Sequence, residues 1–173
     1  MDHSVNYRVM KPGEEDQVID LVSGVFYQFV APLFNDEGVT EFMEYADPLA
    51  LAERIKGDQF VNVAESDGEI IGIIEIREHR HISLFFIKQE HQRKGIGREL
   101  LSRAVQKCIS TNPELTELTV NSSPNAVSAY RALGLVQKGE EKTVNGIRFV
   151  PMSLKINTLN RKERLAQTDG DCR

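Results

Sequence analysis

The chain has 173 residues, a formal net charge of −5, 40% hydrophobic residues and 27% charged residues, which is typical of one soluble globular domain with a sizeable core. The acidic balance argues against a nucleic-acid binder, and the basic cluster between Lys88 and Arg98 is local enough to suit a small anionic ligand. No apolar run reaches membrane-spanning length, and the N-terminus has no signal-peptide pattern. The two cysteines are unlike a secreted disulfide framework. We therefore expect no membrane partner and a cytoplasmic location.

The first third of the chain is expected to form a short strand and then helices. Residues 6–10 alternate apolar and polar side chains, as in a strand. Apolar residues over 18–30 recur with a 3.6-residue period, which indicates an amphipathic helix. A loop over 34–38 leads to a second helical segment that Thr40 can cap and that restarts at Pro48.

The middle of the chain is expected to contain three strands and then an anion-binding turn. The strands are residues 60–65, 70–77 and 82–87, of which the second is rich in β-branched side chains. The loop after the third strand ends in QRKGIG at 92–97, and apolar residues from Leu100 onward lie on one helix face. Such a turn binds anions because the first helical N–H groups are unpaired and glycine lets a phosphate approach the backbone.

The last third is expected to add strands, a short helix and a tail. We expect strands over 115–120, 135–142 and 148–156 and a helix over 126–133. From Asn157 the chain is polar, which predicts a frayed helix or a disordered tail. We therefore expect a domain over residues 1–156 and a tail over 157–173.

Two motifs make the chain resemble the GNAT superfamily of acyl-CoA-dependent N-acyltransferases. The first is [QR]-x-x-G-x-[GA] at 92–97. These residues match neither the Walker phosphate-binding motif nor the dinucleotide-binding fingerprint. A solvated basic turn before an ordinary helix stays an alternative. The second is the segment NSSPNAVSAYRALGL at 121–135, similar to the family's N-x-x-A-x-x-x-Y-x-x-x-G-F with Leu135 in place of the usual Phe. The order of the expected elements from Tyr7 to Ile156 also agrees with the family.

This resemblance implies an α+β (α/β) GNAT fold. The central twisted sheet would be mixed but mostly antiparallel, with about six or seven strands flanked by helices, and a splayed strand pair would form the coenzyme A site. Acetyl-CoA would be the co-substrate and no metal would be needed. The residues implied in binding it are Phe85, Phe86, Ile87, Gln92, Arg93, Lys94, Gly95, Ile96, Gly97, Arg98, Asn121, Asn125 and Tyr130.

Three residues are candidates for proton transfer. By resemblance, Tyr130 would protonate the leaving thiolate, although its spacing also suits a core ring. Glu75 lies between two isoleucines of an apolar strand, where it is either a general base facing a cleft or an ion-pair partner of Arg77. His81 is a second candidate acceptor of the proton. His79 and His81 have no visible third ligand, so we expect no metal site.

The substrate is expected to be a small amine that attacks the thioester directly in a ternary complex. Glu75, Arg77 and Arg148 would bind an acceptor that carries both an amine and a carboxylate, unless Arg77 pairs only with Glu75 and Arg148 is a surface residue. The aromatic segment from Phe26 to Phe42 is expected to form a lid over this small site. Two alternatives stay open: a noncatalytic acyl-CoA-binding regulatory module and a protein N-acetyltransferase. A homodimer is compatible with the sequence.

Overall fold

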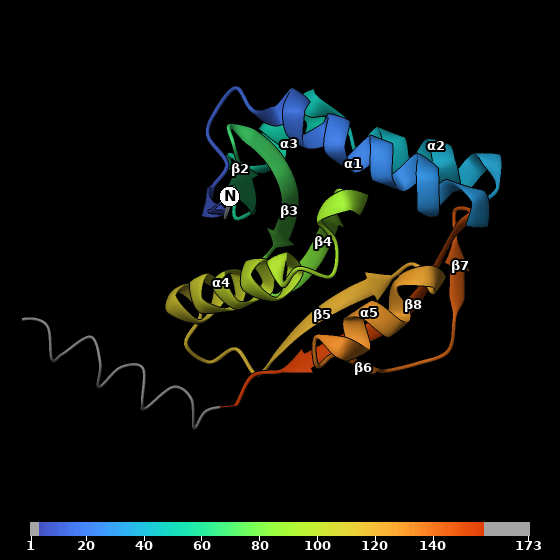
Figure 1. Cartoon of the computed structure of the whole chain (residues 1–173). Coiled ribbons are helices and arrows are strands. Elements are labelled where there is room, and N and C mark those ends of the chain that lie inside the picture. The colour runs from blue at the N-terminus through green and yellow to red at the C-terminus, as the bar shows by residue number, and fades with distance from the viewer. Residues whose placement is uncertain (1–3, 158–173) are drawn as a thin grey trace, which may run out of the picture.

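The computed structural model describes residues 4–157, which form one mixed sheet covered by helices (Figure 1). The expectation for the tail beyond Asn157 lies outside these residues. The strands are β1 (Asn6–Val9), β2 (Phe60–Ser66), β3 (Glu69–Arg77), β4 (His81–Ile87), β5 (Glu117–Ser122), β6 (Val136–Gln137), β7 (Lys142–Val144) and β8 (Ile147–Lys155). The helices are α1 (Glu15–Phe29), α2 (Asp36–Tyr45), α3 (Pro48–Arg54), α4 (Ile96–Thr111) and α5 (Val127–Ala132), with 3-10 turns η1 (Ala31–Leu33), η2 (Gln89–His91) and η3 (Pro124–Ala126).

The order of the strands in the sheet is β1-β2-β3-β4-β5-β8-β6, and β7 pairs with β8. Among the strands of residues 4–157, only the pair β4–β5 is parallel. A mixed, mostly antiparallel sheet flanked by helices is therefore confirmed, with eight strands where the sequence indicated six or seven. The predicted strand over 135–142 divides into the two short strands β6 and β7, which pair with different parts of β8.

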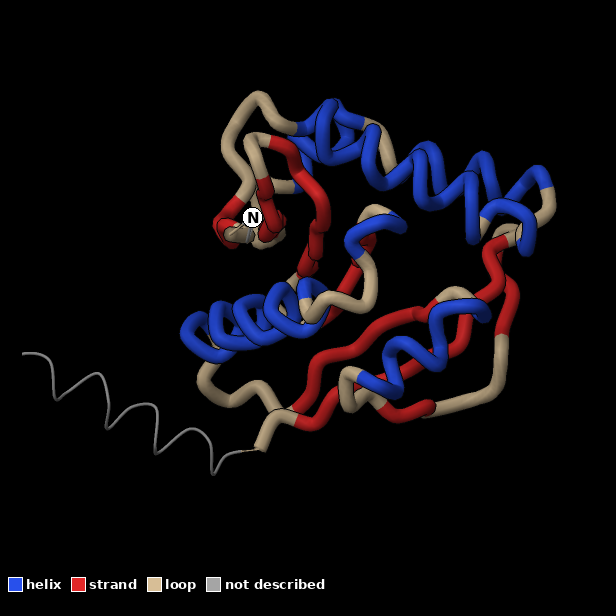
Figure 2. Tube along the Cα trace, in the orientation of Figure 1, coloured by secondary structure: helices blue, strands red, loops and turns tan. Residues whose placement is uncertain are grey.

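Two helical layers cover opposite faces of the β2–β4 part of the sheet (Figure 2). Side chains of β3 point alternately into these layers: Ile74 and Ile76 pack with residues of α4, whereas Ile73 packs with residues of α1 and α3. This explains the β-branched run, since a strand buried on both faces has no polar face. Cys108 of α4 is fully buried in the first of these cores, as expected. In the described part of the chain, no helix is both long and apolar enough to cross a membrane.

The start of α2 differs from the prediction. Asn35 has an extended backbone and its side chain accepts a hydrogen bond from the N–H of Gly38 at 2.9 Å. Asn35 is therefore the N-cap, and the helix begins at Asp36, within the predicted loop over 34–38. Thr40 lies inside the helix, so its prediction as a cap is wrong.

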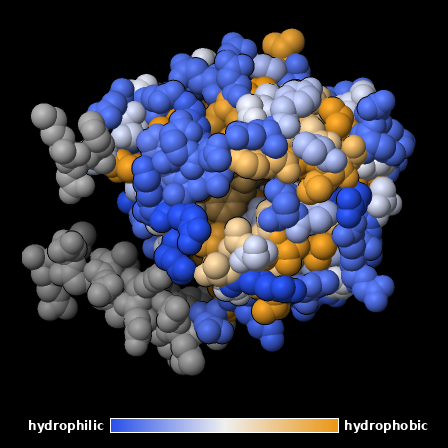
Figure 3. Space-filling view, turned by 45° about the vertical axis from the view of Figure 1, so that its right-hand side comes forward, coloured by the Kyte–Doolittle hydropathy of each residue, from blue (hydrophilic) through white to orange (hydrophobic). Residues whose placement is uncertain are grey.

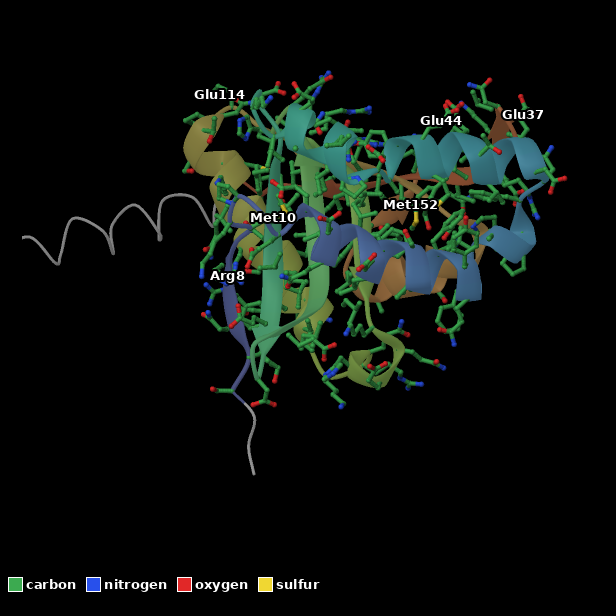
Figure 4. The ribbon with its side chains drawn as sticks, turned by 90° about the horizontal axis from the view of Figure 1, so that it is seen from above. Arg8, Met10, Glu37, Glu44, Glu114 and Met152 are labelled. Atoms are coloured by element: carbon green, nitrogen blue, oxygen red, sulfur yellow. The ribbon has the colours of Figure 1, made fainter. Side chains whose placement is uncertain are left out.

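The aromatic segment from Phe26 to Phe42, for which we predicted a lid, packs partly into the core. Phe26 has no exposed surface and its ring stacks on that of Phe42, with centroids 3.8 Å apart. Phe86 of β4 meets Phe42 edge-on at 6.0 Å. These rings join α1 and α2 to the sheet, and Figure 4 shows the two helices lying side by side above it.

Candidate active site

The central feature of the site is the divergence of β4 from β5. The two strands pair only at His81–Thr119 and Ile82–Val120. Further along, β4 pairs with β3 on its other side, and no strand of residues 4–157 pairs with the β5-facing edge of Phe85–Ile87. The backbone groups on this edge are open to an extended ligand, except the carbonyl of Ile87, which accepts a hydrogen bond from the side chain of Gln92. The splay expected from the sequence is therefore present.

A β-bulge marks the place where the strands part. Glu75 pairs with Leu84 and Ile76 pairs with Ile82, so Ser83 is the extra residue. Bulges of this kind reorient side chains and often lie beside active sites. The hydroxyl of Ser83 is buried and lies near the hydroxyl of Tyr45.

The loop after β4 turns sharply into α4. Arg93 and Gly95 both have left-handed backbones, with φ of 60° and 84°. The side-chain amide of Gln92 donates to the carbonyl of Ile87 at 3.0 Å, which folds the loop against the strand end. The first bond of the helix joins the N–H of Glu99 to the carbonyl of Gly95. No described acceptor takes the N–H groups of residues 93–98, so this turn has the geometry of an anion site.

The glycines of this loop have different roles. A Cβ on Gly95 would meet open space, so the backbone there can approach a ligand. A Cβ on Gly97 would lie 3.1 Å from Cδ1 of Ile87 and 3.6 Å from Cζ of Phe85. Gly97 therefore allows α4 to pack against β4. Of the basic side chains, Arg93 and Lys94 are exposed, whereas Arg98 donates to the carbonyl of Ala132 at 3.1 Å and ties α4 to the end of α5.

Tyr130 lies on α5 and faces the splay. It is 9% exposed, and its ring centroid is 6.0 Å from that of Phe85. Burial raises the pKa of Tyr130, so its phenol is protonated at neutral pH. No described residue hydrogen-bonds with this hydroxyl, so it can serve a ligand. Asn121 and Asn125, which precede α5 on β5 and η3, are both exposed.

Glu75 has a different partner from the one suggested by the sequence. Its side chain has no exposed surface and accepts from Nε of Arg54 at 2.9 Å and from Nη2 at 3.3 Å. The hydroxyl of Tyr45 donates to Glu75 at 3.3 Å, and the guanidinium of Arg54 lies 3.8 Å above the Tyr45 ring. The suggested pair of Glu75 with Arg77 is wrong, because Arg54 and Tyr45 bind the two carboxylate oxygens of Glu75. Glu75 faces α2 and α3.

His81 lies where β4 and β5 still pair. Its Nδ1 is 2.8 Å from Oγ1 of Thr119. Burial and the nearby Arg77 lower the pKa of His81 to about 4, so its ring is neutral at neutral pH. His79 instead stacks on Phe60 with centroids 5.8 Å apart. Within residues 4–157, no three His, Cys, Asp or Glu side chains gather in a group that could hold a metal.

Arg148 and Arg77 do not converge on one site. Arg77, His81, Thr119 and Ser153 lie in one row across the sheet. Arg148 lies five residues (153 − 148) from Ser153 along β8, which is roughly 17 Å in a strand. The guanidinium of Arg148 donates to Glu141 at 2.7 Å and to the carbonyl of Leu33 at 3.3 Å. Binding of one carboxylate by both arginines is therefore not supported by the structure.

A family model described as acetyltransferase (GNAT) domain matches residues 30–156, which is most of the chain. The chain belongs to the GNAT acetyltransferase family. Its fold is similar to those of several solved members that are each less than 25% identical to it. A GCN5-related N-acetyltransferase from Rhodopseudomonas palustris superposes with a TM-score of 0.74 at 20% identity, covering 90% of this chain and 99% of that one.

Two further GNAT structures contain coenzyme A. The PaiA N-acetyltransferase from Thermoplasma acidophilum, in complex with coenzyme A, has a TM-score of 0.73 at 19% identity over 88% of this chain and 99% of that one. An aminoglycoside 6'-N-acetyltransferase complexed with coenzyme A has a TM-score of 0.64 at 12% identity, over 88% of this chain and 97% of that one.

Within this GNAT fold, a contact between α2 and the β7–β8 turn joins the two parts of the sheet beyond the splay (Figure 1). A Cβ on Gly38 would lie 2.2 Å from the carbonyl oxygen of Gly146, and a Cβ on Gly146 would lie 2.1 Å from Oδ1 of Asn35. Asn145 also donates to Glu41 at 3.3 Å. We call these contacts the α2–hairpin bridge. Figure 3 shows a hollow with apolar walls in the face on this side of the molecule.

Sequence reasoning missed Tyr45, Arg54 and Ser83. Tyr45 and Arg54 lie 30 and 21 residues before Glu75. Their positions on helices gave no signal of a shared site. An isolated carboxylate in an apolar strand does require a cationic partner, which was the one signal that could have led to Arg54.

Proposed function

We propose that this GNAT protein is an N-acetyltransferase that moves an acetyl group from acetyl-CoA to the primary amine of a small molecule, by direct attack in a ternary complex. The observation that carries the proposal is that the open edge of β4 ends at the free N–H groups of the α4 turn. An extended chain that ends in a pyrophosphate matches this combination of free strand edge and anion site.

The residues around the splay fit coenzyme A. The backbone N–H groups of 93–98 would hold the pyrophosphate, with Gln92, Arg93 and Lys94 around it. The main chain of Phe85–Ile87 would pair with the amides of the pantetheine arm, and Asn121 and Asn125 are the candidates on its other side. Acetyl-CoA supplies a thioester as acyl donor. Holding it beside an amine can contribute roughly 7–11 kcal/mol to lowering the barrier.

Tyr130 is proposed as the general acid. Because its pKa is raised by burial, it keeps its proton until a stronger base appears nearby, and a leaving thiolate is such a base. Its position beside Phe85 places it next to the strand whose edge would hold the pantetheine arm. The same ring also packs in the core, so the structural and catalytic interpretations are compatible.

Glu75 is proposed to act through Tyr45. Both carboxylate oxygens of Glu75 accept hydrogen bonds and none of its surface is exposed, so an acceptor amine does not reach it directly. A proton from the amine would pass through the hydroxyl of Tyr45, or to the neutral ring of His81. The positive charge of Arg54 balances the negative charge of Glu75. The pair therefore does not strongly stabilise a protonated amine, which favours the neutral amine that can attack the thioester.

The α2–hairpin bridge supports a small acceptor. Backbone atoms of Gly38 and Gly146 lie in close contact there, so no groove for an extended peptide runs between α2 and the hairpin. Of Arg77 and Arg148, only Arg77 lies near the His81 end of the site. A carboxylate on the acceptor would therefore have to bind Arg77.

The test is release of free thiol from acetyl-CoA in the presence of a panel of amines, with the acetylated product identified by mass. The panel should contain amino acids, their amides, simple alkylamines and a short peptide. We expect turnover with small amines and little with the peptide. Tight binding of acetyl-CoA without thiol release from any amine would favour the noncatalytic module, and turnover with the peptide alone would favour a protein acetyltransferase.

A further inference from the structure

A groove lies at the edge of the sheet, between β1 and the C-terminal half of α4. Its volume is about 390 Å³, within the range of small-molecule sites. Its lining includes Tyr7, Val9, Asn62, Arg103, Gln106 and Lys107. Arg8, labelled in Figure 4, lies on the edge strand β1 that forms one wall. Lys107 lies eleven residues (107 − 96) after the start of α4, roughly 16 Å along the helix, so this groove is separate from the proposed acetyl-transfer site.

The floor of the groove is the side chain of Asn62, whose amide opens into the groove. Asn62 is 6% exposed and shares one face of β2 with Phe60 and Ala64, whose side chains belong to the core on the α4 side. No other residue in the described range forms a hydrogen bond with its carboxamide. Most of the side chain is buried, and its amide faces the groove. A ligand in the groove can therefore hydrogen-bond with this amide.

Two cations of α4 stand beside this amide. The ammonium of Lys107 lies 4.6 Å from the centroid of the Phe60 ring, and no described carboxylate pairs with it. Arg103 donates through Nε to Glu99 at 2.7 Å, which leaves both of its Nη groups free, and it lies over the Tyr7 ring at 5.1 Å. Arg8 is already bound to Glu14 and Glu65. None of the residues lining the groove is a carboxylate.

We propose that this groove binds a small organic anion. Lys107, the Nη groups of Arg103 and the amide N–H of Asn62 would hold its carboxylate or phosphate through charge-assisted hydrogen bonds. The Tyr7 ring and Val9, which is 49% exposed, would contact an apolar part of the ligand. Glu99 offsets part of the charge of Arg103, so Lys107 is expected to contribute most to binding.

The test is a titration of the ¹⁵N-labelled full chain, followed through the side-chain amide signals of Asn62 and the backbone signals of residues 103–110. The probes are benzoate, phenyl phosphate and inorganic phosphate, which separate a carboxylate from a phosphate and a ligand with an apolar part from one without. We expect a saturable shift with at least one of the two aromatic probes. Lys107→Gln should weaken binding about tenfold or more, and Lys56→Gln, at an exposed lysine of another surface, should leave it unchanged.

Asn62→Asp is a nearly isosteric second variant, and its carboxylate should repel the anion. If it does not fold, Lys107→Gln alone decides, since that side chain lies at the surface of α4. Binding of acetyl-CoA should be the same in all folded variants, so a failure here is distinct from a failure of the proposed function. The proposal would be overturned by absence of a saturable shift at millimolar probe, or by equal shifts in wild type and Lys107→Gln.

Discussion

The guanidinium of Arg54 binds the carboxylate of Glu75 through two hydrogen bonds, of 2.9 and 3.3 Å, beneath helices α2 and α3. The side chain of Glu75 is fully buried, whereas that of Arg54 is 14% exposed. A charge in such a place depends on its partner, since removal of one member leaves the other buried and uncompensated.

Arg54→Met should therefore lower the free energy of unfolding by about 3–5 kcal/mol, measured by urea denaturation. The double variant Arg54→Met/Glu75→Leu should recover part of this loss, because it removes both charges. Arg80→Met is the matched control, because it breaks a pair with Glu78 that is exposed, and it should change stability little. Equal stability of Arg54→Met and the wild type would show that the pair does not hold α3 on the sheet.

Tyr130→Phe should reduce kcat by about 10²–10⁴-fold, the usual effect of losing a general acid. It should leave acetyl-CoA affinity and thermal stability nearly unchanged, since the described residues give the hydroxyl no hydrogen bond to lose. Tyr27→Phe, at an exposed ring of α1, is the control for loss of a phenol elsewhere. Wild-type turnover by Tyr130→Phe would mean that Tyr130 is a core ring alone.

Lys94→Glu should weaken acetyl-CoA binding about tenfold in calorimetry, because it places a negative charge beside the turn proposed for the pyrophosphate. The effect should shrink as salt is raised. Lys56→Glu, at an exposed lysine on another surface, should bind like the wild type. Gly97→Val is a poorer probe of this turn, since its side chain would first meet Ile87. Unchanged affinity in Lys94→Glu at low salt would contradict the assignment of the turn.

The low pKa of His81, about 4 where a histidine ordinarily titrates at 6.5, should make stability depend on pH. Between these values the unfolded chain binds a proton at His81 and the folded chain does not. Stability from this residue is therefore fully present above pH 6.5 and falls as the pH drops towards 4, by at most about 1.4 kcal/mol per pH unit. Urea denaturation at pH 7 and pH 5 should show a larger loss for the wild type than for His81→Gln. Equal losses would place His81 in a more solvated setting.

Gly146→Ala should destabilise the protein by about 1–3 kcal/mol, since Gly146 has φ of 76° and its Cβ would lie 2.1 Å from Asn35 Oδ1. Gly68→Ala is a close control, because Gly68 has φ of 79° but open space around its Cβ. The difference between the two variants, measured by urea denaturation, reports the α2–hairpin bridge. A difference near zero would mean that the hairpin moves away from α2 at little cost.

Much of this fold could be predicted because its signals are local. The 3.6-residue period of α1, the β-branched run of β3 and the glycine turn before α4 each lie within one element and its neighbours in sequence. The order of these elements and two motifs were enough to predict the fold class, now confirmed by the sheet and by the family match. The cap of α2 was missed because Asn35 and Thr40 both have side chains that can cap a helix, and the choice depends on how α2 packs against the hairpin.

The sequence by itself determined which segments are strands and helices and where an anion-binding turn stands, because backbone propensity and periodicity act over a few residues. Only the tertiary structure decided that Glu75 pairs with Arg54, that Ser83 is an extra residue in β4, and that Arg148 lies far from Arg77. These relationships depend on which residues the packing of α3, the register of β3 with β4 and the path of β8 bring together. A buried charge requires some partner, but its identity is set by packing across the chain.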